Sequence, residues 1–197
     1  MGTGSPLTLP DAEVSYRPRF LSGSEADRTL AYLRANLRWR SLTIRMRGRE
    51  VRSPRLSAWY GDPGIRYTYS GLTLEARGWD PMLEGLRDRL ERELGLRFNG
   101  VLANYYRNGQ DSMGWHADNE PELGPEPVIA SLSLGETRRF LMKHRRRGER
   151  IALELEHGSL LLMTGPTQKW WRHAVPKTVR PVGVRLNLTF RQVQATG

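Results

Sequence analysis

The sequence contains no cysteine among its 197 residues. That absence excludes disulfide scaffolds, cysteine-ligated zinc and iron–sulfur sites, and catalysis by a thiol. Long apolar runs are missing as well: the longest, Leu160 to Met163, is far too short to span a bilayer, and the first residues lack the pattern of a signal peptide. We therefore expect a soluble protein that is not secreted and has no membrane partner, cytoplasmic in a bacterium or nuclear in a eukaryote.

Lysine is scarce too, because 28 of the 31 basic residues are Arg. A genome rich in G and C would favour Arg throughout, so this bias alone has no functional meaning. The net charge of +10 does have meaning, since an excess of positive charge on a folded domain is typical of proteins with a polyanionic partner. With 38% hydrophobic residues, the composition is that of one folded domain.

The N-terminal half predicts two helices. The first begins with Ser24 as its N-cap, and leucines follow at helical spacing. The second begins at Asp80-Pro81 and ends at Gly95. Residues 1–15 have little periodicity and predict a disordered start, whereas the Arg-, Tyr- and Gly-rich residues 39–79 predict hairpins and loops.

Residues 96–193 have a different character, with short segments rich in β-branched, Leu or aromatic residues between Gly, Pro, Asn or charged clusters. We expect strands over Val101–Arg107, Val128–Leu134, Arg139–Lys143, Ile151–Leu155, Ser159–Thr164, Trp170–Val175 and Val184–Val193. So many short strands predict a sandwich, jelly roll or barrel. No linker or repeat divides the chain, so we expect one α+β domain over residues 1–197, with the helices packed on the sandwich.

The last strand alternates strictly over residues 185–191. Leu186, Leu188 and Phe190 share one face, and the opposite face carries Arg185, Asn187, Thr189 and Arg191. Taken alone, this strand fits a solvated polar face better than a buried one. If the two arginines face inward they need anionic partners, because an unpaired buried charge costs several kcal/mol. A small dicarboxylate would offer one carboxylate to each guanidinium.

His116 and Asp118 form a His-x-Asp pair in an extended segment, where side chains two residues apart point the same way. Asn104 and Tyr106 share a face for the same reason. A His-x-Asp pair with a distant His is the set that holds iron(II) while leaving positions open for a cosubstrate and O₂.

Three further histidines could supply the third ligand. His144 lies in a basic segment that we expect to be a solvated loop, and His157 lies in a turn before a strand. His173 lies on an aromatic-rich strand and can face inward, so we favour it over His157. A His-x-Asp pair by itself is more often a surface pair. With the alternating polar strand, however, the residues indicate a site for iron and a dicarboxylate.

These motifs together resemble the AlkB family of iron(II)- and 2-oxoglutarate-dependent nucleic-acid dioxygenases, from about Arg52 to Val193. The similarity rests on Pro54-Arg55, Ala58-Trp59-Tyr60-Gly61-Asp62, Tyr67-Thr68-Tyr69-Ser70-Gly71, Asn104-x-Tyr106, His116-x-Asp118, Ile129-Ala130-Ser131, His157-Gly158-Ser159-Leu160, His173-x-Val175-Pro176 and Arg185-x-Asn187-x-Thr189-x-Arg191.

The resemblance implies a jelly-roll (double-stranded β-helix) core in residues 96–193 and the cofactors Fe(II), 2-oxoglutarate and O₂. It implies that the metal ligands, which are also the catalytic residues, are His116, Asp118 and His173, and that 2-oxoglutarate is bound by Asn104, Tyr106, Arg185, Asn187 and Arg191. The implied reaction is oxidative demethylation of N1-methyladenine and N3-methylcytosine, with release of formaldehyde, succinate and CO₂.

The resemblance also makes residues 39–79 a nucleotide-recognition lid, in which Tyr69 stacks on a flipped base opposite His116. The other implied substrate contacts are Arg47, Arg55, Trp59, Tyr67, Ser70, Asn119 and Glu120, although one or two of the aromatic residues could instead pack beneath the lid. Phosphate contacts are expected from the arginines of residues 38–55 and 145–147.

Two positions depart from the family pattern. Where relatives that open duplex DNA carry a Phe wedge, this chain offers Arg47, so we expect a preference for alkylated single-stranded DNA or RNA. Asn119 replaces an acidic residue that is frequent in relatives, which leaves base selectivity open. The alternatives are the same chemistry on tRNA or on a protein side chain, and a non-catalytic nucleic-acid-binding jelly roll. We expect a monomer.

Overall fold

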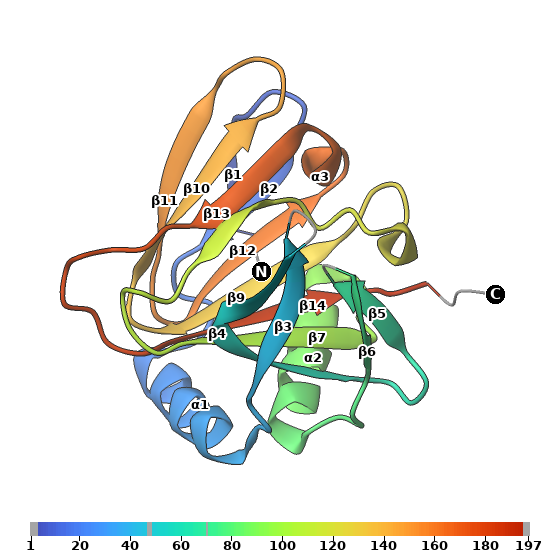
Figure 1. The fold of residues 1–197 in the computed structure, drawn as a ribbon, viewed down its shortest axis with the longest axis vertical. Helices are drawn as coiled ribbons and strands as arrows, with labels where there is room; N and C mark the ends of the chain where they lie inside the picture. Colours follow the sequence, from blue (N-terminus) through green and yellow to red (C-terminus); the bar gives the residue numbers. More distant parts are fainter. Residues whose placement is uncertain (1–3, 47–48, 70, 195–197) are drawn as a thin grey trace.

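Antiparallel sheets dominate the computed structural model, which describes residues 4–46, 49–69 and 71–194 (Figure 1). The large sheet has the strand order β1 (Ser5–Leu7), β2 (Glu13–Arg17), β12 (Ser159–Thr164), β9 (Ile129–Gly135), β14 (Arg185–Arg191), β7 (Gly100–Tyr106), β4 (Arg49–Gly61) and β3 (Arg40–Met46). The small sheet has the order β11 (Arg150–Leu155), β10 (Arg138–His144), β13 (Trp171–Val175) and β8 (Met113–His116). Strands β5 (Arg66–Tyr69) and β6 (Leu72–Glu75) form a separate hairpin.

Two helices cover the outer face of the large sheet (Figure 1). They are α1 (Gly23–Asn36) and α2 (Pro81–Leu94), and the shorter helices are η1 (Pro121–Leu123) and α3 (Thr167–Trp170). The N-cap of α1 is Ser22, so the prediction of Ser24 was wrong by two positions. Ser22 and Glu25 form a capping box in which each side chain binds the other residue's backbone N–H, and Ser24 cannot make that exchange.

The second helix has the predicted ends. The Asp80 side chain accepts a hydrogen bond from the Met82 N–H at 2.9 Å, and Gly95 ends the helix in the left-handed conformation with φ 70°. None of the helices in the described ranges is long and apolar enough to cross a membrane.

Strand β14 separates two hydrophobic cores. Leu186, Leu188 and Phe190 pack with the helices on one side of the large sheet. The polar residues of β14 face the layer between the two sheets, and all seven residues of the strand are buried. The interpretation of the polar side as a solvated face is therefore wrong, and the inward alternative is right.

The predicted jelly-roll core is confirmed, and each of the seven expected strands is present with bounds shifted by no more than two residues. The prediction of disorder over residues 1–15 was wrong for the part that the structure describes, because β1 and β2 pair with each other and β2 pairs with β12. Val14 is buried between the sheets, so this segment is ordered by tertiary contacts that its weak local pattern does not indicate.

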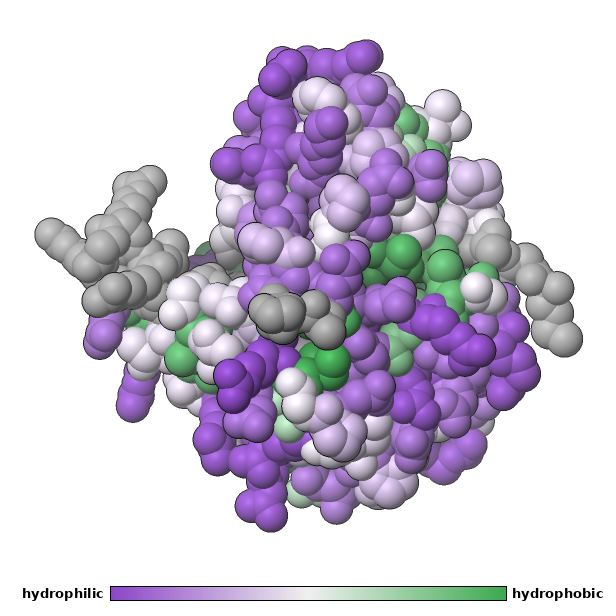
Figure 2. Space-filling model, turned by 90° about the vertical axis from the view of Figure 1, so that its right-hand side faces the viewer, coloured by the Kyte–Doolittle hydropathy of each residue, from purple (hydrophilic) through white to green (hydrophobic). Residues whose placement is uncertain are grey.

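Hydrophilic side chains cover much of the face shown in Figure 2, including the end of the molecule that carries the β10–β11 hairpin.

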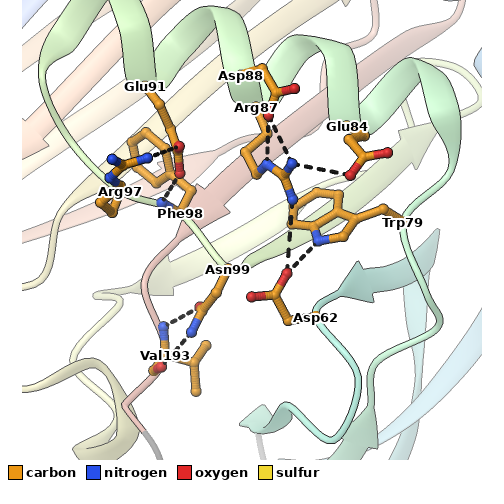
Figure 3. A network of polar contacts seen from close by, with 10 residues as sticks. All are labelled: Asp62, Trp79, Glu84, Arg87, Asp88, Glu91, Arg97, Phe98, Asn99 and Val193. Carbon is orange, nitrogen blue, oxygen red and sulfur yellow. Dashed lines mark hydrogen bonds and ion pairs between the residues drawn. The ribbon is translucent and has the colours of Figure 1, made fainter.

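Separate polar groups tie α2 to the end of β4 and β7 to the end of β14 (Figure 3). Arg87 lies over the Trp79 ring, with 4.7 Å from the guanidinium carbon to the ring centroid, and Trp79 donates a hydrogen bond to Asp62 at 2.6 Å. Asn99 donates to the Val193 carbonyl at 2.8 Å and accepts from the Val193 N–H at 2.7 Å. The Asn99–Val193 pair holds the end of β14 that carries Arg191 beside the start of β7.

Replacing Leu90 with Ala tests the packing of α2 on the large sheet. Leu90 is fully buried in the outer core, so Leu90→Ala should lower the free energy of unfolding by about 2–5 kcal/mol. Arg92→Ala, on the exposed side of the same helix, should change it by about 0.5 kcal/mol or less. Urea unfolding measures both, and equal effects of the two substitutions would contradict the packing described.

Candidate active site

Adjacent strands bring the three predicted metal ligands together. His173 on β13 is the register partner of His116 on β8, so both side chains project from the same face of the small sheet. Their ring centroids are 4.2 Å apart, and Asp118 follows β8 by two residues. One ligand atom from each of the three residues lies within 4.8 Å of the others, so this group could hold a metal ion.

Hydrogen bonds and packing orient the ligands. His116 Nδ1 lies 2.9 Å from the Gly114 carbonyl oxygen. Because a carbonyl can only accept, Nδ1 carries the hydrogen and Nε2 is the nitrogen left to bind a metal. The His173 ring stacks on Phe140 at 5.2 Å, and the Asp118 backbone N–H donates to the Gln168 side chain at 3.0 Å.

The protonation states suit a divalent metal. Burial alone would raise the pKa of Asp118, but Arg191, His173 and His116 outweigh it and lower that pKa to about 2. Burial, with the neighbouring His116, lowers the pKa of His173 to about 3, and burial also lowers the pKa of His116. At neutral pH the group is therefore one carboxylate and two neutral imidazoles, which is the donor set that iron(II) accepts.

Two buried arginines of β14 lie in the same layer. Arg191 Nη2 donates to Asp118 Oδ1 at 2.8 Å, and Arg185 Nη2 donates to Ser133 Oγ at 3.0 Å. Their remaining buried nitrogens, Nε and Nη1 of each, have no hydrogen-bond partner in the part of the chain that the structure describes. Since buried donors are almost always paired, these atoms indicate an acceptor that enters from outside, such as a dicarboxylate.

Each guanidinium also rests on an aromatic ring. The Arg185 carbon lies 5.1 Å from the Tyr106 ring centroid, and the Arg191 carbon lies 5.0 Å from that of Tyr67. Burial lowers the pKa of Arg185. Burial acts in the same direction on Arg191, but the Asp118 carboxylate outweighs it and raises the pKa of Arg191 above its usual value.

One cavity between the sheets joins both groups. The metal ligands line it, and so do all five residues predicted to bind the cosubstrate, which are Asn104, Tyr106, Arg185, Asn187 and Arg191. Asn187 donates to Ser131 Oγ at 2.8 Å, and Asn104 accepts from Ser57 Oγ at 3.1 Å. The strand register explains the convergence, because Asn104 is the partner of Asn187 and Tyr106 is the partner of Arg185.

Arg55, which was predicted to contact substrate, lies in the interior of the structure. Its side chain is only 2% exposed and donates to Asn104 Oδ1 at 2.8 Å. The Arg55 guanidinium therefore holds Asn104, a residue that lines the cavity.

Trp59 and Tyr67 were also predicted to contact substrate, and they too lie in the interior. Their rings stack at a centroid distance of 5.1 Å and are 4% and 0% exposed. Both rings pack in the interior, Trp59 from β4 and Tyr67 from the β5–β6 hairpin, as the alternative to substrate contact expects. Asn119 is exposed and Glu120 is half-buried, directly after Asp118. Arg47, Ser70 and the side chain of Tyr69 lie outside the described residues.

The two remaining histidines do not join the metal group. His144 is buried at the end of β10, with Nε2 3.2 Å from Asp11 Oδ2, so its placement in a solvated loop was wrong. The Asp11 segment covers it, and residues 1–15 had not been expected to be ordered. His157 lies in the predicted turn, where its Nδ1 accepts from the Gly135 N–H at 2.7 Å.

Arg138 is a residue of this site that sequence reasoning missed. It is buried behind Tyr106, with 5.8 Å from the guanidinium carbon to the ring centroid. It donates to the backbone carbonyls of Asn108, Asp111 and Pro176 at 3.1, 3.0 and 2.7 Å. Nothing in the sequence separates it from the other 27 arginines, because its role depends on three loops that meet only in the fold.

The fold and the site define a class of protein: a jelly roll whose two sheets enclose two histidines, one carboxylate and two buried arginines. The family model described as 2OG-Fe(II) oxygenase superfamily matches residues 13–191, and the chain belongs to this family. Membership implies Fe(II), 2-oxoglutarate and O₂ as cofactors, and the donor set and unpartnered arginine nitrogens fit the metal and the dicarboxylate.

Individual relatives agree with this assignment. The chain is 42% identical over 192 residues to the human "Alpha-ketoglutarate-dependent dioxygenase alkB homolog 3", covering 92% of this chain and 66% of that protein. It is 46% identical over 151 residues to the mouse "DNA oxidative demethylase ALKBH2", covering 73% of this chain and 63% of that protein. The chain thus spans slightly less than two thirds of the length of these curated relatives.

A solved structure, that of OsALKBH1, has a TM-score of 0.64 at 19% identity and covers 94% of this chain and 100% of that chain. At this identity the similarity supports the fold alone.

The choice of the third ligand can be tested by metal binding. His173→Ala should weaken binding of iron(II) or cobalt(II) by about 100-fold or more, since changes around a ligand alone already cost about 10–100-fold. His157→Ala should leave the affinity unchanged, because His157 does not belong to the metal group. Anaerobic calorimetric titration measures both, and a loss confined to His157→Ala would contradict the assignment.

Proposed function

We propose that this chain is an iron(II)- and 2-oxoglutarate-dependent dioxygenase that oxidatively demethylates alkylated bases in nucleic acid. The observation that carries the proposal is the metal group in one cavity with two arginines whose buried nitrogens lack partners. The substrates are N1-methyladenine and N3-methylcytosine, and the products are formaldehyde, succinate, CO₂ and the repaired base. The names of the two relatives, a dioxygenase and a DNA oxidative demethylase, support this reaction for the whole protein.

The cavity residues divide the binding of 2-oxoglutarate between them. Arg185 holds the remote carboxylate, because its unpartnered nitrogens suit a bidentate carboxylate. Arg191 lies near the carboxylate that binds the metal, and Asn104, Tyr106 and Asn187 supply further polar contacts. Iron(II), when bound with 2-oxoglutarate and O₂, supplies the oxidising power that hydroxylates the N-methyl group, after which the hemiaminal releases formaldehyde.

The chain's own residues prepare the site for that chemistry. Arg191 keeps Asp118 ionised and occupies its Oδ1, which leaves Oδ2 for the metal. Phe140 stacks on His173, and the Trp59–Tyr67 pair lies below Arg191, so apolar rings exclude water around the polar group. The reacting methyl group is thereby placed in a dry, oriented site.

The substrate is a single strand of alkylated DNA or RNA. The net charge of +10 supports a polyanionic partner, and Arg38, Arg40 and Arg52 are exposed in the first basic segment. The single-strand preference follows from Arg47 in place of an apolar wedge. Tyr69 stacks on the flipped base, and Ser70, Asn119 and Glu120 also contact it. Asn119 stands where relatives often have an acidic residue, which leaves the choice between the two methylated bases open.

The chain acts as a monomer of one domain, with residues 39–79 as its lid. It acts in the cytoplasm of a bacterium or the nucleus of a eukaryote.

The reaction can be tested on defined oligonucleotides. The iron-loaded protein is incubated with 2-oxoglutarate and an oligonucleotide of about 15 nucleotides that carries one methylated base, single-stranded or in duplex. Mass spectrometry should show succinate and loss of the methyl group in equal amounts, faster on the single strand. His116→Ala should abolish both. Succinate without demethylation of any oligonucleotide would exclude the proposal, and turnover of methylated tRNA or of a protein digest instead would favour the alternative substrates.

Arg185→Gln tests the placement of the dicarboxylate. Removing the charge should raise the dissociation constant for 2-oxoglutarate by about 10- to 100-fold, because a charged hydrogen bond is worth about 1.5–3 kcal/mol. Metal affinity should not change. Arg139→Gln, an exposed change on β10, is the matched control and should have no effect. If anaerobic calorimetry found equal 2-oxoglutarate affinity for both variants, Arg185 would not hold the cosubstrate.

A further inference from the structure

The outer face of the small sheet carries a row of like charges. Lys143 on β10 lies directly opposite Arg172 on β13 and opposite Arg150 on β11. Their neighbours on the same strands, His144, Trp171 and Ile151, point inward, so the three cations share the outward face. Like charges directly opposite each other destabilise a sheet, so the fold gains nothing from this row.

The positive charge continues at the open end of the β10–β11 hairpin. An open cavity of about 410 Å³ is lined by Lys143, His144, Arg145, Arg146, Gly148, Arg150 and Arg172. Burial lowers the pKa of Arg145, and the nearby Arg172 lowers it further. Within the described chain none of these five cations forms an ion pair, whereas the neighbouring Arg147 pairs with Asp11 at 3.2 Å.

A buried histidine fixes the turn that carries these arginines. His144 Nδ1 accepts from the backbone N–H groups of Arg146 and Arg147 at 3.2 and 3.0 Å. Nδ1 is therefore the acceptor, so Nε2 carries the hydrogen and donates to Asp11. The turn backbone is thus held in one conformation, which reduces the entropy lost when the cations bind an anion.

Two tryptophans interleave with the cations. Trp115 on the edge strand β8 is 39% exposed, and Lys143 Nζ lies 4.5 Å from its ring centroid. Arg146 and Lys169 lie 5.1 and 5.2 Å from the Trp170 ring centroid. Cations for the backbone beside aromatic rings for the bases are the arrangement with which proteins bind single-stranded nucleic acid.

We propose that this surface, which we call the basic strip, binds the sugar–phosphate backbone of the single strand that flanks the base in the active site. Its residues are Trp115, Lys143, Arg145, Arg146, Arg150 and Arg172. The strip begins at the edge of the site, because His116 faces the cavity and its neighbour Trp115 faces outward. The row from β11 to β13 spans about 10 Å, which is long enough to contact more than one phosphate of the same strand. This inference rests on the proposed function.

The double variant Lys143→Gln/Arg150→Gln tests the strip without touching the metal ligands. Its affinity for a fluorescein-labelled oligonucleotide of about 15 nucleotides without methylated bases should fall about tenfold at low salt. The slope of log affinity against log salt should become shallower by about 1.4, which is about 0.7 for each lost phosphate contact. Trp115→Ala should weaken binding about tenfold without changing the slope. Fluorescence anisotropy measures all three.

Arg28→Gln/Arg92→Gln is the matched control, because it removes two exposed cations from α1 and α2, on the far side of the large sheet. Its affinity and slope should equal those of the native chain within experimental error. The thermal midpoint of the strip variant should equal or exceed that of the native chain, since repulsion is removed. A slope equal to that of the control variant would overturn the inference.

Demethylation of an oligonucleotide of about 5 nucleotides separates this inference from the proposed function. Such a strand has only about two nucleotides on each side of the target base, so the strip variant should lose less of the native rate on it than on the strand of about 15 nucleotides. An equal loss of demethylation rate on the short and the long strand would overturn the inference about the basic strip. Absence of demethylation by the native protein on either strand would exclude the proposed function. The salt dependence of binding would still test whether the basic strip contacts the nucleic-acid backbone.

Discussion

The buried ion pair between Arg191 and Asp118, 2.8 Å from Nη2 to Oδ1, is the interaction on which the site depends. A carboxylate enclosed between two sheets would become protonated without a cation, because burial disfavours its charged form. Arg191 prevents this and leaves Oδ2 free beside the two histidines. The guanidinium is in turn only partly satisfied by Asp118, since its Nε and Nη1 have no partner within the described residues. The pair thus prepares the same end of the cavity for a metal and for an anionic group beside it.

Sheet register positions everything else around this pair. Strand β14 lies in the middle of the large sheet between β9 and β7, so its outward leucines anchor it to the helices while its polar side lines the cavity. The β13–β8 pairing sets the two histidines side by side from the opposite sheet. The basic strip is the other side of the same small sheet. The alternation that turns His173 inward also turns Arg172 outward, so one strand pairing serves a buried metal group and an exposed charged surface.

The sequence was informative where a pattern is local. Strict alternation over residues 185–191 predicted which side chains of β14 share a face, and the His-x-Asp pair predicted two neighbouring ligands. It was uninformative where the partner is distant in the chain. Strand β2 pairs with β12 and β1 pairs with β2, and the burial of Arg55, Trp59 and Tyr67 depends on distant contacts that no local pattern reveals. The row of Lys143, Arg150 and Arg172 is likewise visible only once three strands are placed in register.

We infer that the two buried arginines of β14 select a ligand with two carboxylates at a fixed separation. The most direct measurement is the thermal midpoint of the manganese-loaded protein with 2-oxoglutarate or with 2-oxopentanoate, which has the same metal-binding end but lacks the remote carboxylate. Ligand binding stabilises the folded state in proportion to the logarithm of concentration over the dissociation constant. We expect 2-oxoglutarate to raise the midpoint and 2-oxopentanoate to leave it nearly unchanged. Equal shifts with the two compounds, or none with either, would contradict the account.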